Sequence, residues 1–103
     1  MMILYNVTLK VDQQIHEEWK QWMCEVHIPD VMSTGLFKEY KMCKLLGLDE
    51  ADGITYAVQY FSASMEDFEE YQSKHARRLQ TEHMNRYKDR YVAFRTMMEV
   101  VSS

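Results

Sequence analysis

Histidine is the residue type in this chain best suited to proton transfer, because an unperturbed imidazole has a pKa of about 6.5. Two of the four histidines lie at positions that favour such a role. His27 immediately precedes the Ile28-Pro29 step where a predicted helix ends, and Asp30 is close enough in sequence to orient its ring. His75 lies in the middle of the apolar face of a second predicted helix. We therefore take His27 and His75 as candidate catalytic residues.

Each of these histidines also has a purely structural interpretation. His75 fits better as a core histidine whose ring nitrogens bond to the sheet or the first helix, since an unbonded buried imidazole costs about 1–3 kcal/mol. His27 is equally consistent with bonding to the last carbonyls of its helix. His16 and His83 are expected to face solvent or the helix flanks.

Four polar residues interrupt otherwise apolar strands, and we take them as candidate ligand-binding residues. A small-molecule site is typically an apolar cavity with a few convergent polar groups, and the gap between helices and sheet is where we expect one. The alternative is that Arg95 pairs with Glu39 or Glu99 and that Tyr56 packs at a dimer interface. The four residues are Asn6, Tyr56, Gln59 and Arg95.

The sequence predicts neither a metal site nor a cofactor. His75 and His83 are two helical turns apart, too far to share one ion without a bend, and Cys24-Glu25-Val26-His27 offers two ligands at most. The acidic loop at 49–53 lacks the ligand spacing of a calcium site, and no glycine-rich phosphate loop occurs. Haem would need an axial ligand, for which His27 and His75 are the only candidates.

Composition limits the class of protein. The chain has 103 residues, 47% of them hydrophobic, with three glycines and one proline, which predicts one compact domain over residues 1–103. The net charge of −4 argues against nucleic acid or an anionic membrane as partner. No apolar run approaches the roughly 20 residues of a membrane span and no leader is evident, so we expect a cytoplasmic protein. Cys24 and Cys43 are expected to be reduced, small, buried side chains.

Two helical stretches should position the candidate residues. In the first, apolar residues with helical spacing follow Asp12, a plausible N-cap, and the helix should stop near His27 and restart for one turn over 29–32. The second should begin with a capping box at Ser64 and continue, with room for a bend, toward Tyr87. The expected apolar faces are Ile15, Trp19, Trp22, Met23 and Val26 in the first helix and Phe68, Tyr71, His75 and Leu79 in the second.

Four strand-like runs surround these helices, at 3–11, 36–46, 54–61 and 91–101. The resulting order βαββαβ predicts an α+β, ferredoxin-like fold with both helices on one face of a four-stranded antiparallel sheet. The last strand is rich in large apolar residues on both faces. Something should therefore cover the second face, and a two-fold related copy of the same sheet is the simplest cover.

Several segments resemble an uncharacterised family of small bacterial proteins classed as a domain of unknown function. The segments are MILYNVT, WMCEVHIPDVMSTGLF, DGITYAVQYF and YVAFRTMMEV, and the resemblance covers essentially the whole chain. That family is similar to the dimeric α+β barrel superfamily, whose members include cofactor-free monooxygenases, small isomerases, haem-dependent enzymes and stress-response proteins. The resemblance implies a homodimer of facing sheets, and it carries no activity or catalytic motif to this chain.

Two hypotheses of function follow. The first is a homodimer that binds a small apolar ligand, or a cofactor-independent enzyme on an apolar or aromatic substrate, with His27 and His75 reaching a helix-to-sheet cavity. The second is a non-catalytic interaction or regulatory dimer, which predicts a closed core and no cavity large enough for a ligand.

Overall fold

A computed structural model describes all of residues 1–103, and its elements follow the expected order. Each helical segment consists of two α-helices joined by one π-helical turn. The bounds are β1 Ile3–Val11, α1 His16–Trp22, a π turn Met23–His27, α2 Ile28–Met32, β2 Glu39–Lys44, β3 Ile54–Ser62, α3 Met65–Tyr71, a π turn Gln72–Ala76, α4 Arg77–Tyr87 and β4 Tyr91–Glu99. The βαββαβ prediction is confirmed.

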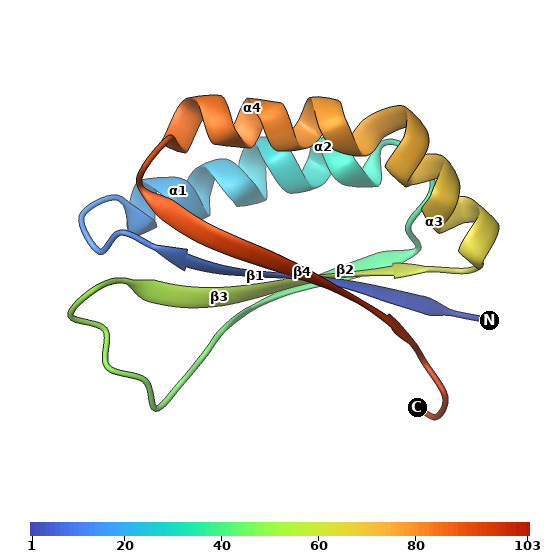
Figure 1. Ribbon diagram of the computed structural model, residues 1–103, viewed down its shortest axis with the longest axis horizontal. Coiled ribbons are helices and arrows are strands. Elements are labelled where there is room, and N and C mark those ends of the chain that lie inside the picture. The colour runs from blue at the N-terminus through green and yellow to red at the C-terminus, as the bar shows by residue number, and fades with distance from the viewer.

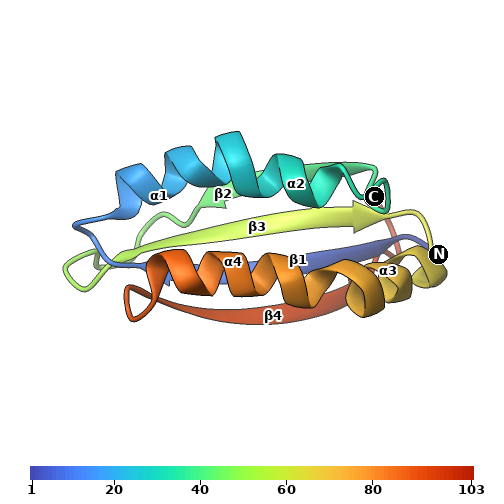
Figure 2. The same cartoon turned by 90° about the horizontal axis from the view of Figure 1, so that it is seen from above.

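The four strands form one antiparallel sheet in the order β2-β3-β1-β4, with Val7 at the centre of β1 opposite Val58 of β3 and Arg95 of β4. Both helical segments lie on one face of this sheet, and the opposite face carries no helix (Figure 1). Seen from above, the two segments run side by side along the sheet, with β2 and β4 at its outer edges (Figure 2). The ferredoxin-like fold is therefore confirmed.

Alternation along the strands places one set of side chains under the helices. In β1 the buried residues Ile3, Tyr5, Leu9 and Val11 occupy odd positions, and in β3 the helix-facing residues occupy even positions, from Ile54 to Ser62. The register pairs these two sets directly, Tyr5 with Tyr60 and Leu9 with Tyr56. The core is thus a layer between the sheet and the helices.

The first helical segment continues through the point where we expected it to stop. The π turn lies directly before Pro29, whose ring would clash with the carbonyl of Glu25 in a regular α-helix, and this wider turn carries the helix past the proline. The buried residues are spaced by four, five and three positions, Trp19, Met23, Ile28 and Val31. Val26, expected on the buried face, is therefore 40% exposed.

The second segment also contains a π turn, and His75 does not lie on the buried face where we expected it. Its buried residues are Phe68, Tyr71, Ala76, Leu79, His83 and Tyr87, with a step of five across the π turn. The extra residue places Ala76 in the core and moves His75 to the half-buried flank of the helix, where its Nδ1 lies 3.4 Å from a guanidinium nitrogen of Arg78. Likewise His83 is buried, although we expected it at the surface.

Three smaller expectations have mixed outcomes. Ser64 caps α3 as predicted, because its hydroxyl accepts a hydrogen bond from the Asp67 amide at 3.1 Å. Asp12 does not cap α1: its carboxylate accepts the Gln14 amide at 2.8 Å and pairs with Arg90 at 3.0 Å. Cys24 and Cys43 are both exposed, so the prediction of buried thiols is wrong.

The uncovered face of the sheet combines apolar and polar side chains. Val92 and Phe94 of β4 are 67% and 64% exposed, and Met98 is 40% exposed. At the centre of the same face, the Gln59 amide donates to Asn6 at 3.3 Å and the Asn6 amide donates to Thr8 at 2.9 Å. Large apolar groups in water at a sheet edge call for a partner surface.

None of the helices combines the length and the apolar character needed to cross a membrane.

The β2–β3 connection returns to the sheet at Gly53, where no side chain fits. A Cβ on Gly53 would lie 2.7 Å from the carbonyl oxygen of Val11, and its φ is +154°. We expect Gly53→Ala to lower the free energy of unfolding by about 2–3 kcal/mol, as measured by urea denaturation. Gly47→Ala is the matched control, because Gly47 has a φ of +82° but open space around its Cβ position. It should cost only about 1 kcal/mol, and an equal cost at both sites would contradict the close-contact argument.

Candidate functional site

A small cavity lies between the helices and the sheet, next to the first π turn. Its volume is about 30 Å³, enough for one or two water molecules. It is bordered by side chains from β1, β3, β4 and both helical segments, and most of them are apolar. The lining residues are Tyr5, Val7, Leu9, Met23, His27, Val31, Tyr60, Tyr71, Leu79, Gln80, His83 and Arg95.

His83 is held in place by a hydrogen bond across the helical layer. The indole Nε1–H of Trp19, a fully buried residue of α1, donates to His83 Nε2 at 2.9 Å. Because an indole nitrogen only donates, Nε2 must be unprotonated, and the neutral imidazole therefore carries its proton on Nδ1. Burial, with smaller contributions from His27 and Arg95, lowers the pKa of His83 to about 3. His83 is thus a neutral side chain of fixed tautomer.

His27 borders the cavity and contains a polar atom without a hydrogen-bond partner. It ends the first π turn, its ring stacks on Trp22 with 5.4 Å between centroids, and its centroid lies 5.7 Å from that of His83. Its Nδ1 is buried without a hydrogen-bond partner, which costs about 1–3 kcal/mol unless a water or ligand supplies one. Burial lowers the pKa of His27 to about 4, opposed by Asp30 and assisted by Arg95.

Three tyrosines supply hydroxyl groups to the cavity wall. Burial raises the pKa of Tyr5, Tyr60 and Tyr71, so all three remain protonated at neutral pH. At Tyr5 this effect is opposed by Arg95 and Gln80, which lie close to its hydroxyl. A neutral phenol both donates and accepts hydrogen bonds, so these groups suit an oxygen atom of a ligand.

Arg95 is the only charged residue of the cavity lining. It comes from the centre of β4 and forms no ion pair within the chain, so the expected pairing with Glu39 or Glu99 is wrong. A guanidinium without a carboxylate partner favours an anionic oxygen nearby. The cavity therefore combines one cation with neutral imidazoles and phenols.

This set of groups suits hydrogen bonding and proton acceptance. With pKa values of about 4 and 3, His27 and His83 are uncharged at pH 7 and are not acids there. Burial is the main cause of both low pKa values, and an anion bound at Arg95 would offset the smaller contribution that the positive charge of Arg95 makes. The arrangement thus couples ligand charge to proton affinity.

Two of the six candidate site residues meet at this cavity, His27 and Arg95. Asn6 and Gln59 lie on the uncovered face of the sheet and bond to each other there. The sequence does not determine which set of alternating strand residues points toward the helices, so it does not predict the sheet face on which these two residues lie. His75 does not line the cavity.

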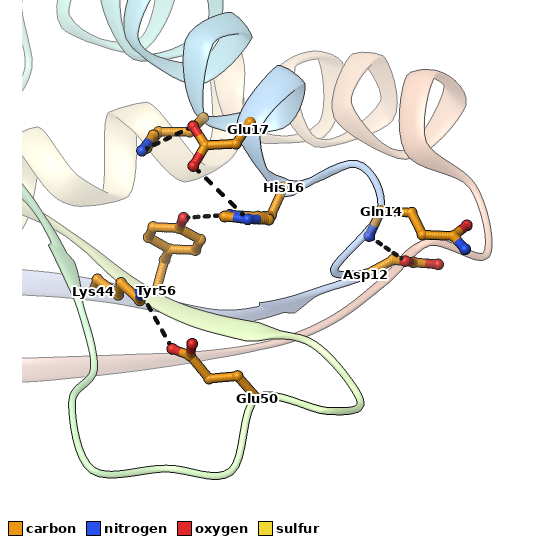
Figure 3. Close-up of polar contacts among 8 residues, drawn as sticks. Asp12, Gln14, His16, Glu17, Lys44, Glu50 and Tyr56 are labelled. Atoms are coloured by element: carbon orange, nitrogen blue, oxygen red, sulfur yellow. Dashed lines mark hydrogen bonds and ion pairs between the residues drawn. The ribbon is translucent and has the colours of Figure 1, made fainter.

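Tyr56 faces the helices but lies in a different hollow, of about 260 Å³, beneath α1. Figure 3 shows its hydroxyl pointing at the imidazole of His16, with 3.0 Å between the oxygen and Nδ1. His16 also lies 3.8 Å from Glu17, and Lys44 of β2 pairs with Glu50 at 3.3 Å. The charges in this hollow are therefore matched within the chain, unlike Arg95.

His83 is the site residue that helical periodicity missed. In a regular helix aligned on Phe68 and Leu79, position 83 lies at the edge of the buried face, and position 75 lies nearer its centre. The π turn reverses that assignment. A step of five between Tyr71 and Ala76, parallel to the step from Met23 to Ile28, is the signal that a search for shifted periodicity would detect.

No three of the His, Cys, Asp and Glu side chains of the structure come close enough together to hold a metal ion.

Comparison with known proteins shows a family and a fold. The sequence profile of DUF4286, a domain of unknown function, matches residues 2–101. No curated protein matches the chain in sequence.

Solved structures similar to this one share its fold at low identity. An EthD-like protein from Ralstonia eutropha JMP134 is 19% identical, with a TM-score of 0.70 over 99% of this chain and 94% of that one. A dimeric ferredoxin-like protein from an uncultured marine organism is 13% identical, with a TM-score of 0.73 over 98% and 96%. SnoaB, a cofactor-independent oxygenase from Streptomyces nogalater, is 8% identical, with a TM-score of 0.71 over 99% and 95%.

The depressed histidine pKa values predict a pH-dependent stability. Unfolded histidines bind protons below about pH 6.5, whereas His27 and His83 in the folded chain do so only near pH 4 and 3. The free energy of unfolding should therefore fall as the pH drops from about 6.5 to about 4, by up to about 1.4 kcal/mol per pH unit for each histidine. His83→Gln, measured by urea denaturation across this range, should remove about one histidine's share. His75→Gln, on the half-buried flank, should keep the wild-type profile, and an unchanged profile in His83→Gln would contradict the assignment.

Proposed function

The chain belongs to the DUF4286 family, a domain of unknown function, and we propose that it is a homodimer that binds a small, largely apolar molecule between its helices and its sheet. The observation that carries this proposal is the buried, unpartnered Nδ1 of His27 at an apolar cavity that also contains His83 and Arg95. A ligand with one polar end would satisfy that nitrogen. Its apolar body would contact the aliphatic and aromatic lining.

The proposal extends to cofactor-independent catalysis on an apolar or aromatic substrate. His27 would accept a proton from an acidic group of the substrate, and Arg95 would stabilise the resulting negative charge. His83 would donate a hydrogen bond to the ligand, because Trp19 occupies its Nε2 and its Nδ1 carries the proton. Trp19 acts here as a positioning residue.

One observation favours the second candidate, a non-catalytic assembly. The cavity of about 30 Å³ admits only a ligand's tip, and the core is otherwise closed. The two candidates share the dimer and differ in whether the cavity takes up a ligand.

Dimerisation through the uncovered sheet face is testable by charge insertion. Phe94 is 64% exposed on that face, and a carboxylate there would be buried without a partner in a dimer of facing sheets. We expect Phe94→Asp to be monomeric by native mass spectrometry and light scattering, and the wild-type protein to be dimeric. Val26→Asp is the control, because Val26 is 40% exposed but lies in the helical layer on the other side of the sheet. A dimer that survives Phe94→Asp and dissociates in Val26→Asp would place the interface on the helices.

Ligand uptake is testable with phenol, an apolar ring with one hydroxyl. Phenol should shift the NMR signals of the Trp19 indole N–H and of His83, because its hydroxyl would bond to His27 Nδ1 next to them. His27→Phe keeps an aromatic ring but removes that acceptor and should weaken phenol binding about tenfold, the equivalent of one good hydrogen bond. His75→Phe should leave binding unchanged. If the signals of Trp19 and His83 do not shift, the non-catalytic assembly is the one candidate function that remains.

A further inference from the structure

A second, larger hollow adjoins the cavity on its outer side. It is a groove of about 360 Å³ between α4 and the edge strand β4. Gln80 and Arg95 border both the groove and the inner cavity, so the two spaces meet at these side chains. The position of β4 at the outer edge of the sheet, alongside α4, is visible in Figure 2. The groove is therefore the outer approach to the cavity.

The groove carries positive charge that the chain does not neutralise. Arg77 and Arg95 line it, and no acidic residue does. Neither arginine has an ion pair, whereas Arg86 pairs with Glu18 at 2.9 Å and Arg90 pairs with Asp12 at 3.0 Å. The groove thus holds two arginines without carboxylate partners in a chain whose net charge is −4. Their charge is available to a ligand.

The remaining lining indicates what kind of anion fits. Ala76, Met84 and Tyr91 offer apolar surface, and Gln72, Gln80 and Thr81 offer neutral hydrogen-bonding groups. A guanidinium matches a carboxylate in geometry and forms charge-assisted bonds with it. The inner cavity accepts only a small tip, so the larger part of any ligand must lie in the groove.

We propose that the groove between α4 and β4 is the subsite for the carboxylate of a small amphipathic acid, held by Arg77 and Arg95, whose other end enters the cavity past Gln80. This inference rests on the proposed function and specifies its substrate class: a small aromatic or short aliphatic carboxylic acid. Arg95 contacts both parts of the ligand, and Arg77 contacts the carboxylate alone. Binding of the carboxylate also brings negative charge toward the two histidines of the cavity.

The experiment compares 4-hydroxybenzoate with 4-hydroxybenzamide, which has the same shape but no charge, by calorimetric titration and NMR. We expect the carboxylate to bind at least about tenfold more tightly than the amide. Arg77→Gln and Arg95→Gln should each weaken carboxylate binding about tenfold, and Arg77→Gln should leave the amide unchanged. Arg95→Lys, which keeps the charge, should retain part of the preference for the carboxylate. Thermal melting confirms that each variant is folded.

Arg78→Gln is the matched control, because Arg78 is the next residue of α4 and contacts His75, outside the groove. It removes the same charge and should leave both affinities unchanged. Equal loss in Arg78→Gln would indicate general attraction and overturn the inference. Equal binding of carboxylate and amide, unaffected by Arg77→Gln, would also overturn it while the proposed function stands. If neither compound binds nor shifts the Trp19 and His83 signals, the inference and the ligand-binding function fail together.

Discussion

The hydrogen bond from Trp19 to His83 joins the two helical segments across the core, and the site depends on it. Trp19 is fully buried and its indole N–H has no other partner, so the bond satisfies a donor that would otherwise cost about 1–3 kcal/mol. The same bond fixes the orientation and tautomer of His83. It therefore serves stability and chemistry together, and the cavity exists where the two helices are joined in this way.

Much of the fold follows from local patterns in the chain. Strand alternation, the Ser64 cap and the βαββαβ order were sufficient to predict the sheet and the helices on one face, because each depends on neighbouring residues. The exchange of His75 for His83 was not predictable by regular periodicity, since one extra residue in a turn shifts every later position. The faces of Asn6 and Gln59 depend on sheet parity, which only tertiary contacts decide.

The electrostatics of the site depend on which arginines have a carboxylate partner and which do not. Surface cations such as Arg86 and Arg90 have carboxylate partners, whereas Arg95 has none and lies beside two imidazoles that burial keeps neutral. A cation next to neutral bases suppresses their protonation, and any anion that binds reverses the effect. His27 and Arg95 were expected at a helix-to-sheet cavity from their types and positions, and the structure brings them together there.

The two π turns have a consequence for how this family tolerates changes in chain length. Each turn contains one residue more than a regular helix needs, so removing one residue from 72–76 would rotate everything before it by about 100° relative to α4. Such a deletion would preserve a continuous helix and yet move Tyr71 away from the side of the helix on which His83 lies. The location of the site is thus encoded in helix length as well as in residue identity. Sequence comparisons that close gaps within helices would misplace it.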